Sequence, residues 1–349
     1  MPRRWLPVLF RFPWAVLALG VTATACSDGV NTQRQTITPP LNTADTTDPA
    51  GSASAGSAGS AAVGSGADDV EPEAAMDLFP PSDHTAHPST GCGGNGSPPV
   101  GGQILSTGGQ DGHYLITVPP GYDPNTPYAL GFVFHGANNT EVTCRGGGNC
   151  NGVQMGLESK SIVIYVRSFG TSWTNETRDQ NVDFFDDLLA FTKANYCVDE
   201  RRVYALGTSS GAHFSNILGC RRGDQLLAIA PGAGERLEKA DCQGRFAALV
   251  VHGVDDTSVP FPLGQEARDF YAQQNGCRSE TVPPLAELHA EVRAARDAGM
   301  GIFRCADYQG CEDGLPVRWC EHGEGGYDGS THGYPPEAGP MTWDFVSPL

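Results

Sequence analysis

The pentapeptide Gly207-Thr208-Ser209-Ser210-Gly211 places a serine two residues from a glycine on either side. It follows the apolar run Val203–Leu206 and precedes a helical pattern, so the serine is expected at a sharp strand-to-helix turn. The glycines let strand and helix approach closely enough to hold Ser209 in strained dihedrals. A hydroxyl displayed in this way is typical of a nucleophile that attacks a carbonyl carbon. The alternative is a glycine-rich turn without chemistry, which the flanking strand and helix disfavour.

Serine chemistry needs an imidazole oriented by a carboxylate, because a hydroxyl is a poor nucleophile until a base takes its proton. In sheets with such a turn, the chain order is serine, acid, histidine. The acid candidates after Ser209 are Asp255 and Asp256, which follow the apolar run Ala247–Val251. The order of residues alone leaves both open.

Two histidines, His322 and His332, lie downstream of the acid candidates. His332 is preferred because its small-residue loop, 329–335, would let the imidazole reach over the sheet edge, whereas a strand should still constrain His322. His213 is nearer to Ser209 in sequence, but it precedes the acid, against the expected order. It is expected to pack in the first helical turn.

Acyl transfer also needs N–H groups aimed at the oxygen that becomes negatively charged. One donor is the N–H of Ser210, the residue after the predicted nucleophile, and the second should come from the loop after an early strand. The apolar run that ends at Phe134 leads into His135-Gly136-Ala137. We assign the second donor to Ala137, with Gly136 as the alternative, and expect His135 to hold the turn.

These residues require a scaffold of strands alternating with helices. Strand patterns occur at Tyr128–Phe134, Ser161–Val166, Arg202–Leu206, Ala247–Val251 and Pro316–Trp319. Helical patterns occur at Asp183–Ala194, Gly211–Leu218 and Leu263–Gln274. The alternation predicts an α/β fold, with a mostly parallel sheet covered by helices on both faces. A further helix is expected at Pro284–Met300, outside this alternation.

The N-terminus is typical of an exported protein. Residues 1–25 are predicted to be a signal peptide, since arginines precede the apolar run Ala15–Ala25, which is too short to span a bilayer. Ala23-Thr24-Ala25-Cys26 resembles a bacterial lipoprotein processing site, which would make Cys26 a lipid anchor. The alternative is cleavage nearby, with Cys26 as a spare thiol. The protein is expected outside the cytoplasm, either anchored to the outer membrane or secreted.

Residues 26–90 are dominated by Ser, Gly, Ala, Thr, Pro and Asp. Such a segment cannot bury enough apolar surface to offset the entropy of ordering, so we expect a disordered tether. Residues 91–349 then form one domain of a common size for an α/β fold.

The composition limits the partners. The 349 residues carry a formal net charge of -18, which disfavours broad binding to nucleic-acid phosphates or anionic lipid, and membrane contact is expected only through a lipid anchor. Eleven cysteines indicate an oxidising compartment, and without Cys26 an even set is left for disulfides. No two cysteines have C-x-x-C spacing, so a zinc cluster is disfavoured. We expect no metal and no cofactor.

The domain of residues 91–349 resembles secreted feruloyl esterases of the α/β-hydrolase fold, which are related to polyhydroxybutyrate-depolymerase-type esterases. The matching segments include Gly91-Cys92-Gly93, Phe134-His135-Gly136, Cys197-Val198-Asp199, Gly207–Gly211, Asn275-Gly276-Cys277, Pro316–Cys320 and His332-Gly333-Tyr334-Pro335. Several of these have no general structural reason to occur together.

The resemblance implies several residue roles. The family pattern His-Gly-x-x-Asp-x-x-Val-Pro assigns the acid to Asp256, which would leave Asp255 as a solvated loop charge. A family tryptophan corresponds to Trp173 and implies a substrate pocket there, although Asn181-Val182-Asp183 replaces the family's Gly-Asp-Val. The family's Gly-Gly before the final histidine is replaced by Ser330-Thr331. The helix at Pro284–Met300 looks like an addition that could cover the acyl group.

The resemblance also implies disulfides Cys277–Cys311 and Cys305–Cys320, while Cys144 and Cys150 flank a glycine-rich loop that could close locally. The predicted function is a serine carboxylesterase acting on feruloyl or related hydroxycinnamoyl esters of plant cell-wall polysaccharide or oligosaccharide. The alternatives within the same chemistry are an acetyl-xylan esterase or a polyhydroxyalkanoate depolymerase. The alternative from another class is a non-catalytic carbohydrate-binding lipoprotein.

Overall fold

The computed structural model describes residues 85–94, 98–148, 150, 152–239, 242–323 and 331–349, together with the backbone of 33–35. The predicted signal peptide, the predicted anchor Cys26 and most of the predicted tether lie outside the described residues, as do residues 324–330 in front of His332.

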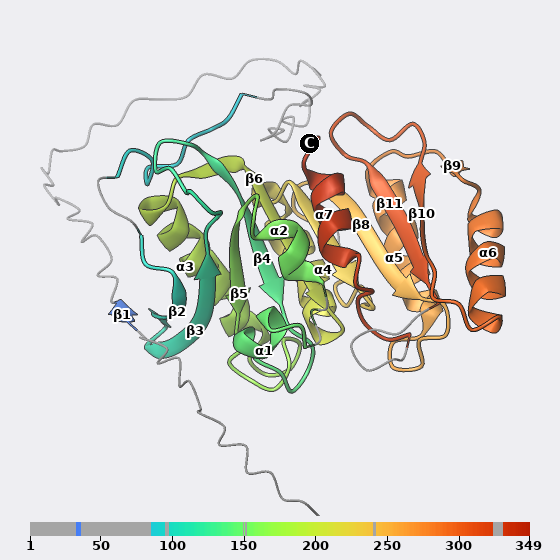
Figure 1. Ribbon diagram of the computed structural model, residues 1–349, viewed down its shortest axis with the longest axis horizontal. Helices are drawn as coiled ribbons and strands as arrows, with labels where there is room; N and C mark the ends of the chain where they lie inside the picture. The colour runs from blue at the N-terminus through green and yellow to red at the C-terminus, as the bar shows by residue number, and fades with distance from the viewer. Residues whose placement is uncertain are drawn as a thin grey trace, which may run out of the picture. The chain divides into compact units, whose positions relative to one another are not determined.

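The five strands and four helices expected from the sequence are present (Figure 1). The strands are β1 (Gln33–Gln35), β2 (Gly101–Thr107), β3 (Gln110–Thr117), β4 (Tyr128–Phe134), β5 (Ile162–Val166), β6 (Val198–Thr208), β7 (Ala228–Gly232), β8 (Ala247–Gly253), β9 (Thr281–Val282), β10 (Phe303–Tyr308) and β11 (Val317–His322). Strands β1, β2, β3, β7, β9 and β10 are additional to those expected. The helices are α1 (Glu141–Arg145), α2 (Val153–Leu157), α3 (Arg178–Asn195), α4 (Ser210–Arg222), the 3₁₀ turn η1 (Gly223–Gln225), α5 (Phe261–Gln274), α6 (Leu285–Asp297) and α7 (Ala338–Val346).

The strands form one mixed sheet in the order β1-β2-β3-β5-β4-β6-β7-β8-β11-β10-β9. The run from β5 to β11 is parallel throughout, whereas β3 joins it antiparallel to β5 and β10 joins it antiparallel to β11. Parallel strands leave their carboxyl ends at one edge, and in this fold the reacting groups follow those ends. The α/β-hydrolase fold expected from the resemblance is confirmed.

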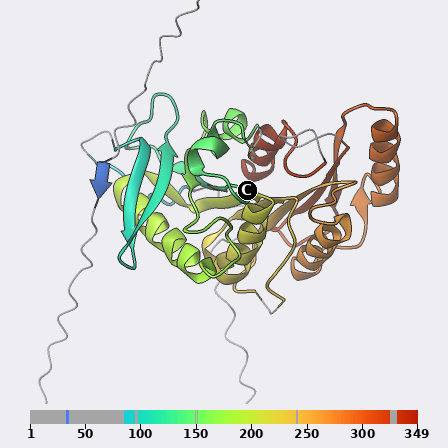
Figure 2. The ribbon, with the colours of Figure 1, turned by 90° about the horizontal axis from the view of Figure 1, so that it is seen from below.

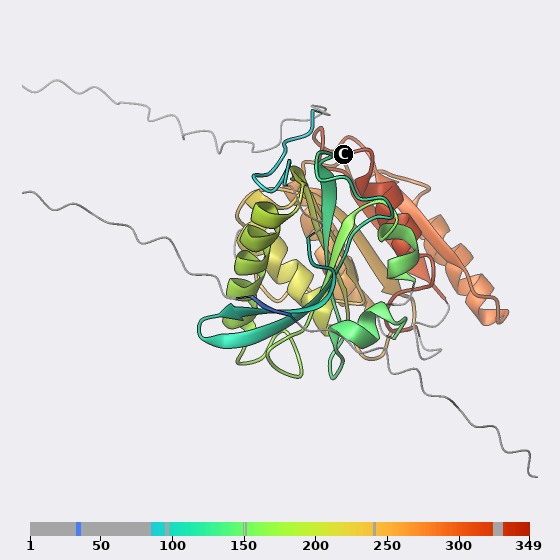
Figure 3. The same cartoon turned by 60° about the vertical axis from the view of Figure 1, so that its left-hand side comes forward.

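Alternate residues of the central strand β6 face two different apolar layers. Val203 and Ala205 belong to one buried cluster, and Tyr204 and Leu206 belong to the other. This is the period of two that a strand buried on both faces must have. Helices α3, α4 and α5 contribute to the first cluster, and α2 and α7 to the second. Figures 2 and 3 show these two groups of helices on opposite sides of the sheet.

All ten cysteines after Cys26 are paired in disulfides. The pairs expected from the resemblance, Cys277–Cys311 and Cys305–Cys320, are confirmed, and so is the local closure of Cys144 with Cys150. Two further bridges, Cys92–Cys197 and Cys220–Cys242, were not assigned from the sequence. Cys305 and Cys320 face each other across the antiparallel pair β10–β11, so this bridge fixes the edge of the sheet.

The ordered contacts begin before residue 91. The hydroxyl of Ser89 donates to the carbonyl of Tyr196 at 2.8 Å, and the N–H of His87 donates to the carboxylate of Asp199 at 3.0 Å. Ser89 is buried against the domain. The packed domain therefore starts a few residues before the expected boundary. Backbone pairing of β1 with β2 also occurs inside the segment expected to be a tether.

Along the part of the chain that the structure describes, no helix is both long enough and apolar enough to cross a membrane.

Candidate active site

Ser209 lies in the turn between β6 and α4 with φ 54° and ψ -120°, a strained conformation for a residue with a side chain. Its N–H donates to the carbonyl of Gly232 on β7 at 2.9 Å, which fixes the turn to the neighbouring strand. The flanking glycines are required by space. A Cβ at Gly207 would overlap the carbonyl of Gly211, and one at Gly211 would overlap the carbonyl of Phe134. The turn has the geometry that the pentapeptide predicts.

Asp256 follows β8 and is buried. One carboxylate oxygen accepts the N–H groups of Ser258 and Val259, each at 2.9 Å, and the other lies 2.8 Å from Nδ1 of His332. Burial alone would raise the pKa of Asp256, but the hydrogen bonds from His332 and from the Val259 backbone outweigh it and hold the pKa below its usual value. Asp256 is therefore an anion held in one orientation and shared with an imidazole.

Asp255 is not a solvated loop charge, contrary to the expectation. Its carboxylate is paired with two arginines of α6, Arg293 at 2.5 Å and Arg296 on its other oxygen. The two neighbouring carboxylates thus have different partners. Asp256 contacts His332, and Asp255 attaches α6 to the loop after β8.

The two candidate histidines, His332 and His322, also have different partners. His332 has a side chain that is 17% exposed, and it contacts Asp256. His322 ends β11, is fully buried, and has its Nε2 3.1 Å from the carbonyl of Gly333. A ring held in this way supports the loop that carries His332 but cannot reach a substrate.

His213 lies one helical turn after Ser209. Burial first, and then the nearby imidazoles of His332 and His252, lower its pKa to about 4, against an opposing effect of Asp256. His213 is therefore neutral near pH 7. The pKa of His213 is affected by both His332 and Asp256, so these two residues lie within electrostatic range of the first turn of α4. Ser209 immediately precedes that turn.

The two expected oxyanion donors lie on neighbouring loops. Ala137 follows β4 and is exposed, and the next residue, Asn138, has φ 57° and donates its N–H to the carbonyl of Thr171 at 2.8 Å. Ser210 begins α4, where the first N–H groups have no partner within the helix. Among the residues that the structure describes, neither the N–H of Ala137 nor that of Ser210 has a hydrogen-bond partner. Both are available to an anion.

Trp173 does not line an open pocket. Its side chain has no exposed surface and packs against Phe134 and Phe214, with ring centroids 5.0 and 4.8 Å away. Its indole N–H donates to the carbonyl of His135 at 2.7 Å. The expected substrate contact is thus replaced by a buried support beneath the loop after β4.

Helix α6 covers the edge of the sheet. Leu288, Val292 and Ala295 are its buried residues, and the helix packs on β10 and β11. Figure 1 shows α6 beyond the end of the sheet that carries β9 and β10. Its link to the site is the pairing with Asp255, so the expected cover over an acyl group is replaced by a support for the acid loop.

One group of interacting residues was not predicted from the sequence. The hydroxyl of Ser210 lies 2.8 Å from that of Ser172 and accepts the N–H of Trp173 at 3.0 Å. The cluster of Ser and Thr at 171–174, after the strand that ends at Val166, is the only hint that the sequence offers. Nowhere in the described ranges do three or more His, Cys, Asp or Glu side chains converge as metal ligands would.

No protein-family model matches the chain. Feruloyl esterase D of Neurospora crassa is 29% identical over 285 residues, which are 76% of this chain and 92% of that protein. Feruloyl esterase C of Emericella nidulans is 26% identical over 263 residues, 72% of this chain and 91% of its own length. The chain is a carboxylic-ester hydrolase related to the feruloyl esterases. A probable feruloyl esterase C of Aspergillus niger is 28% identical over 267 residues, 74% of this esterase and 90% of the relative.

Solved structures of esterases are also similar to this esterase. An acetyl xylan esterase from Aspergillus awamori matches with a TM-score of 0.48 and 14% identity, over 68% of this chain and 94% of that one. A ferulic acid esterase from Anaeromyces mucronatus, in complex with ferulic acid, matches with a TM-score of 0.40 and 14% identity, over 53% and 84% of the two chains.

Proposed function

We propose that the protein is a serine carboxylesterase that works through a covalent acyl-enzyme, with Ser209 as the nucleophile. The observation that carries the proposal is the 2.8 Å contact between Nδ1 of His332 and Asp256. A carboxylate accepts only, so Nδ1 carries the proton and Nε2 is left as a base. This is the tautomer that a serine esterase requires.

In the proposed reaction, Oγ of Ser209 attacks the carbonyl carbon of the ester and its proton passes to Nε2 of His332. Asp256 stabilises the imidazolium that results, without taking the proton. The N–H groups of Ala137 and Ser210 stabilise the oxyanion of the tetrahedral intermediate. The intermediate collapses to acyl-Ser209, and the alcohol leaves with the proton from His332. Water then attacks the carbonyl carbon of acyl-Ser209, with His332 again as the base, and the carboxylic acid is released.

We propose a feruloyl or related hydroxycinnamoyl ester of plant cell-wall polysaccharide as the substrate. Support comes from the relatives, whose names specify feruloyl esters. Acetylated xylan and hydroxybutyrate oligomers are the alternatives. The domain has no strongly basic character that would favour a polyanion, since the whole chain carries a net charge of -18.

The test compares kcat/KM of wild type, Ser209→Ala and Ser106→Ala on methyl ferulate, acetylated xylan and hydroxybutyrate oligomers. Ser106 lies on β2, away from the loops of the site, and serves as the matched control. Ser209→Ala should lose about 10⁴-fold or more, because a serine nucleophile acts as one unit with its base. Full turnover by Ser209→Ala would contradict the serine mechanism, and a preference for acetylated xylan would contradict only the substrate.

We also propose that the enzyme works outside the cytoplasm, either secreted or held at the outer membrane through a lipid on Cys26. The disulfides support an oxidising compartment. Palmitate labelling of the full chain that disappears in Cys26→Ser would support the anchor, and a soluble, unlabelled wild-type product would contradict it.

A further inference from the structure

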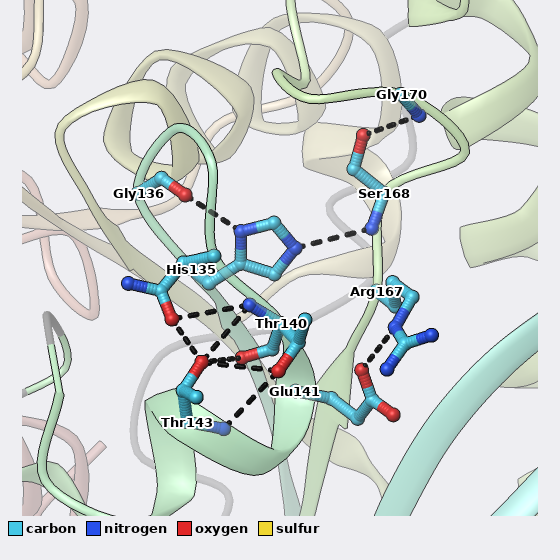
Figure 4. Close-up of polar contacts among 9 residues, drawn as sticks. His135, Gly136, Thr140, Glu141, Thr143, Arg167, Ser168 and Gly170 are labelled. Carbon is cyan, nitrogen blue, oxygen red and sulfur yellow. Dashed lines mark hydrogen bonds and ion pairs between the residues drawn. The ribbon is translucent and has the colours of Figure 1, made fainter.

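The loops after the neighbouring strands β4 and β5 are joined by four polar contacts, beyond the sheet itself. Figure 4 shows two of them, between Glu141 and Arg167 and between His135 and Ser168. We call residues 135–141 the donor turn, because it contains Ala137, and residues 167–173 the clamp. The contacts join Glu141 to Arg167 (2.6 Å), His135 Nε2 to Ser168 N (3.3 Å), Asn138 N to Thr171 O (2.8 Å) and Trp173 Nε1 to His135 O (2.7 Å). The donor turn is thus held along its whole length.

The ring of His135 is fixed as one neutral tautomer. Its Nδ1 lies 2.7 Å from the carbonyl of Gly136, which can only accept, so Nδ1 carries the proton. Its Nε2 is then free to accept the N–H of Ser168. Burial lowers the pKa of His135, which keeps the ring in the neutral form that this bond requires.

The ion pair between Glu141 and Arg167 closes the far end of the donor turn. The Glu141 side chain is only 8% exposed and that of Arg167 is 38% exposed. Glu141 is the first residue of α1, whose start is fixed by a reciprocal capping interaction of Thr140 and Thr143. Arg167 is fixed in turn, because its N–H donates to the carbonyl of His113 on β3 at 3.0 Å. Because the Glu141 carboxylate is buried, removing Arg167 would leave a buried charge without its partner, which is costly.

The clamp also reaches the second donor. The hydroxyl of Ser210 accepts the N–H of Trp173 and lies 2.8 Å from the hydroxyl of Ser172. One seven-residue segment therefore contacts both loops that supply an oxyanion donor, the donor turn with Ala137 and the start of α4 with Ser210.

We propose that the clamp sets the separation of the two oxyanion donors, with Glu141 and Arg167 as positioning residues for ester hydrolysis. The inference rests on the proposed function, because the donors matter only if an oxyanion forms. Donors that are already placed need no reorganisation when charge develops. Loss of the ion pair should let the Ala137 N–H drift and weaken the transition state more than the bound ester.

The test is Glu141→Gln against Glu158→Gln in the full chain. Glu158 is a matched control because it also forms an ion pair with an arginine, Arg145 of α1 at 2.8 Å, but it does not pair with a clamp residue. We expect Glu141→Gln to lower kcat on methyl ferulate by about 10- to 100-fold, the range that a displacement near 1 Å produces, with KM nearly unchanged. The rate of Ser209 labelling by a fluorophosphonate should fall in parallel, since the adduct places an oxygen at the donors. Glu158→Gln should change neither quantity.

A double-mutant cycle separates positioning from packing. If Glu141 and Arg167 act through one contact, Glu141→Gln/Arg167→Gln should lose no more kcat than the worse single variant. A lower unfolding midpoint with wild-type kcat would overturn the inference, and so would a raised KM with unchanged kcat. If Glu141→Gln does not fold, Ser172→Ala, at a half-buried position, carries the same test through Ser210.

The two proposals fail differently. Full activity of Ser209→Ala would overturn both of them. An inactive Ser209→Ala together with a fully active Glu141→Gln would overturn only the role of the clamp.

Discussion

The two sides of Ser209 are held by different combinations of contacts. On the donor side, the loops after β4 and β5 are joined by directional polar bonds, which include the ring of His135 and the Glu141–Arg167 pair. On the acid–base side, the loops after β8 and β11 combine polar contacts, such as His332 with Asp256 and His322 with Gly333, with close packing. A Cβ at Gly253 would overlap the carbonyl of Thr331, and one at Gly232 would overlap the ring of Tyr334.

This difference indicates what each side tolerates. Polar bonds depend on direction and charge. A change such as Glu to Gln on the donor side should therefore lower activity even though the side-chain volume is unchanged. Close packing fixes the distance between two loops. Larger side chains on the acid–base side should therefore displace the loops that carry Asp256 and His332. On the acid–base side, Asp255 and His322 have the same side-chain types as Asp256 and His332 but different roles. Variants of Asp255 and His322 therefore serve as controls.

The largest effect is expected at the base. His332→Ala should lower kcat by about 10⁵- to 10⁶-fold, because the histidine of a serine triad is needed for every proton transfer. His322→Ala should keep most of the kcat of the folded enzyme while lowering its stability, since His322 is buried and its Nε2 lies 3.1 Å from the carbonyl of Gly333. Steady-state kinetics with thermal melts of both variants check this. A reversed pattern would assign the base to His322.

A smaller but still large effect is expected at the acid. Asp256→Asn should lower kcat by about 10⁴-fold, because an amide no longer selects the Nδ1–H tautomer of His332. Asp255→Asn should stay within a few-fold of wild type and lose at most about 1 kcal/mol, because its partners on α6 are largely exposed. Parallel kcat measurements and urea titrations compare the two. Equal losses of kcat would show that α6 controls the acid loop more strongly than we expect.

The smallest effect is on stability as a function of pH. Burial lowers the pKa of His135 on the donor side, and lowers that of His213 beside the acid–base pair from 6.5 to about 4. Below pH 6.5 the unfolded chain binds protons that the folded chain does not, so the free energy of unfolding should fall as pH drops toward 4. His213→Asn should flatten this slope, whereas His113→Asn, on β3, should not. Urea titrations from pH 7 to 4 check it, and equal slopes in all three proteins would contradict the assignment.

The sequence predicts the nucleophile turn well because its requirement is local. Two glycines beside Ser209 and a strand before it determine the backbone, and nothing distant is needed. The choice between Asp255 and Asp256 depends on the loop fold, so spacing alone left both open and only the family pattern favoured Asp256. The structure gives the physical reason, since Arg293 and Arg296 come from a helix nearly forty residues further along and occupy Asp255.

Other features were missed for separate reasons. The hairpin of β2 and β3 closes through Gly108 and Gly109, both with positive φ, and its strands have weak apolar alternation. The pocket role of Trp173 came from the resemblance, and its burial depends on tertiary contacts with Phe134 and Phe214 that the sequence does not show. The clamp could not be predicted because its contacts join separate loops, with Glu141 and Arg167 26 positions apart and His135 and Ser168 33 positions apart in the sequence.

The central claim is that ester hydrolysis passes through an acyl group on Ser209. The most direct measurement mixes the wild-type protein with an activated feruloyl or acetyl ester, quenches with acid during the first turnover, and locates the added mass by peptide mass spectrometry. We expect an acyl mass on the peptide that contains Ser209, which decays with the turnover rate and is absent from Ser209→Ala. Turnover without any acyl mass on that peptide, or equal turnover by Ser209→Ala, would contradict it.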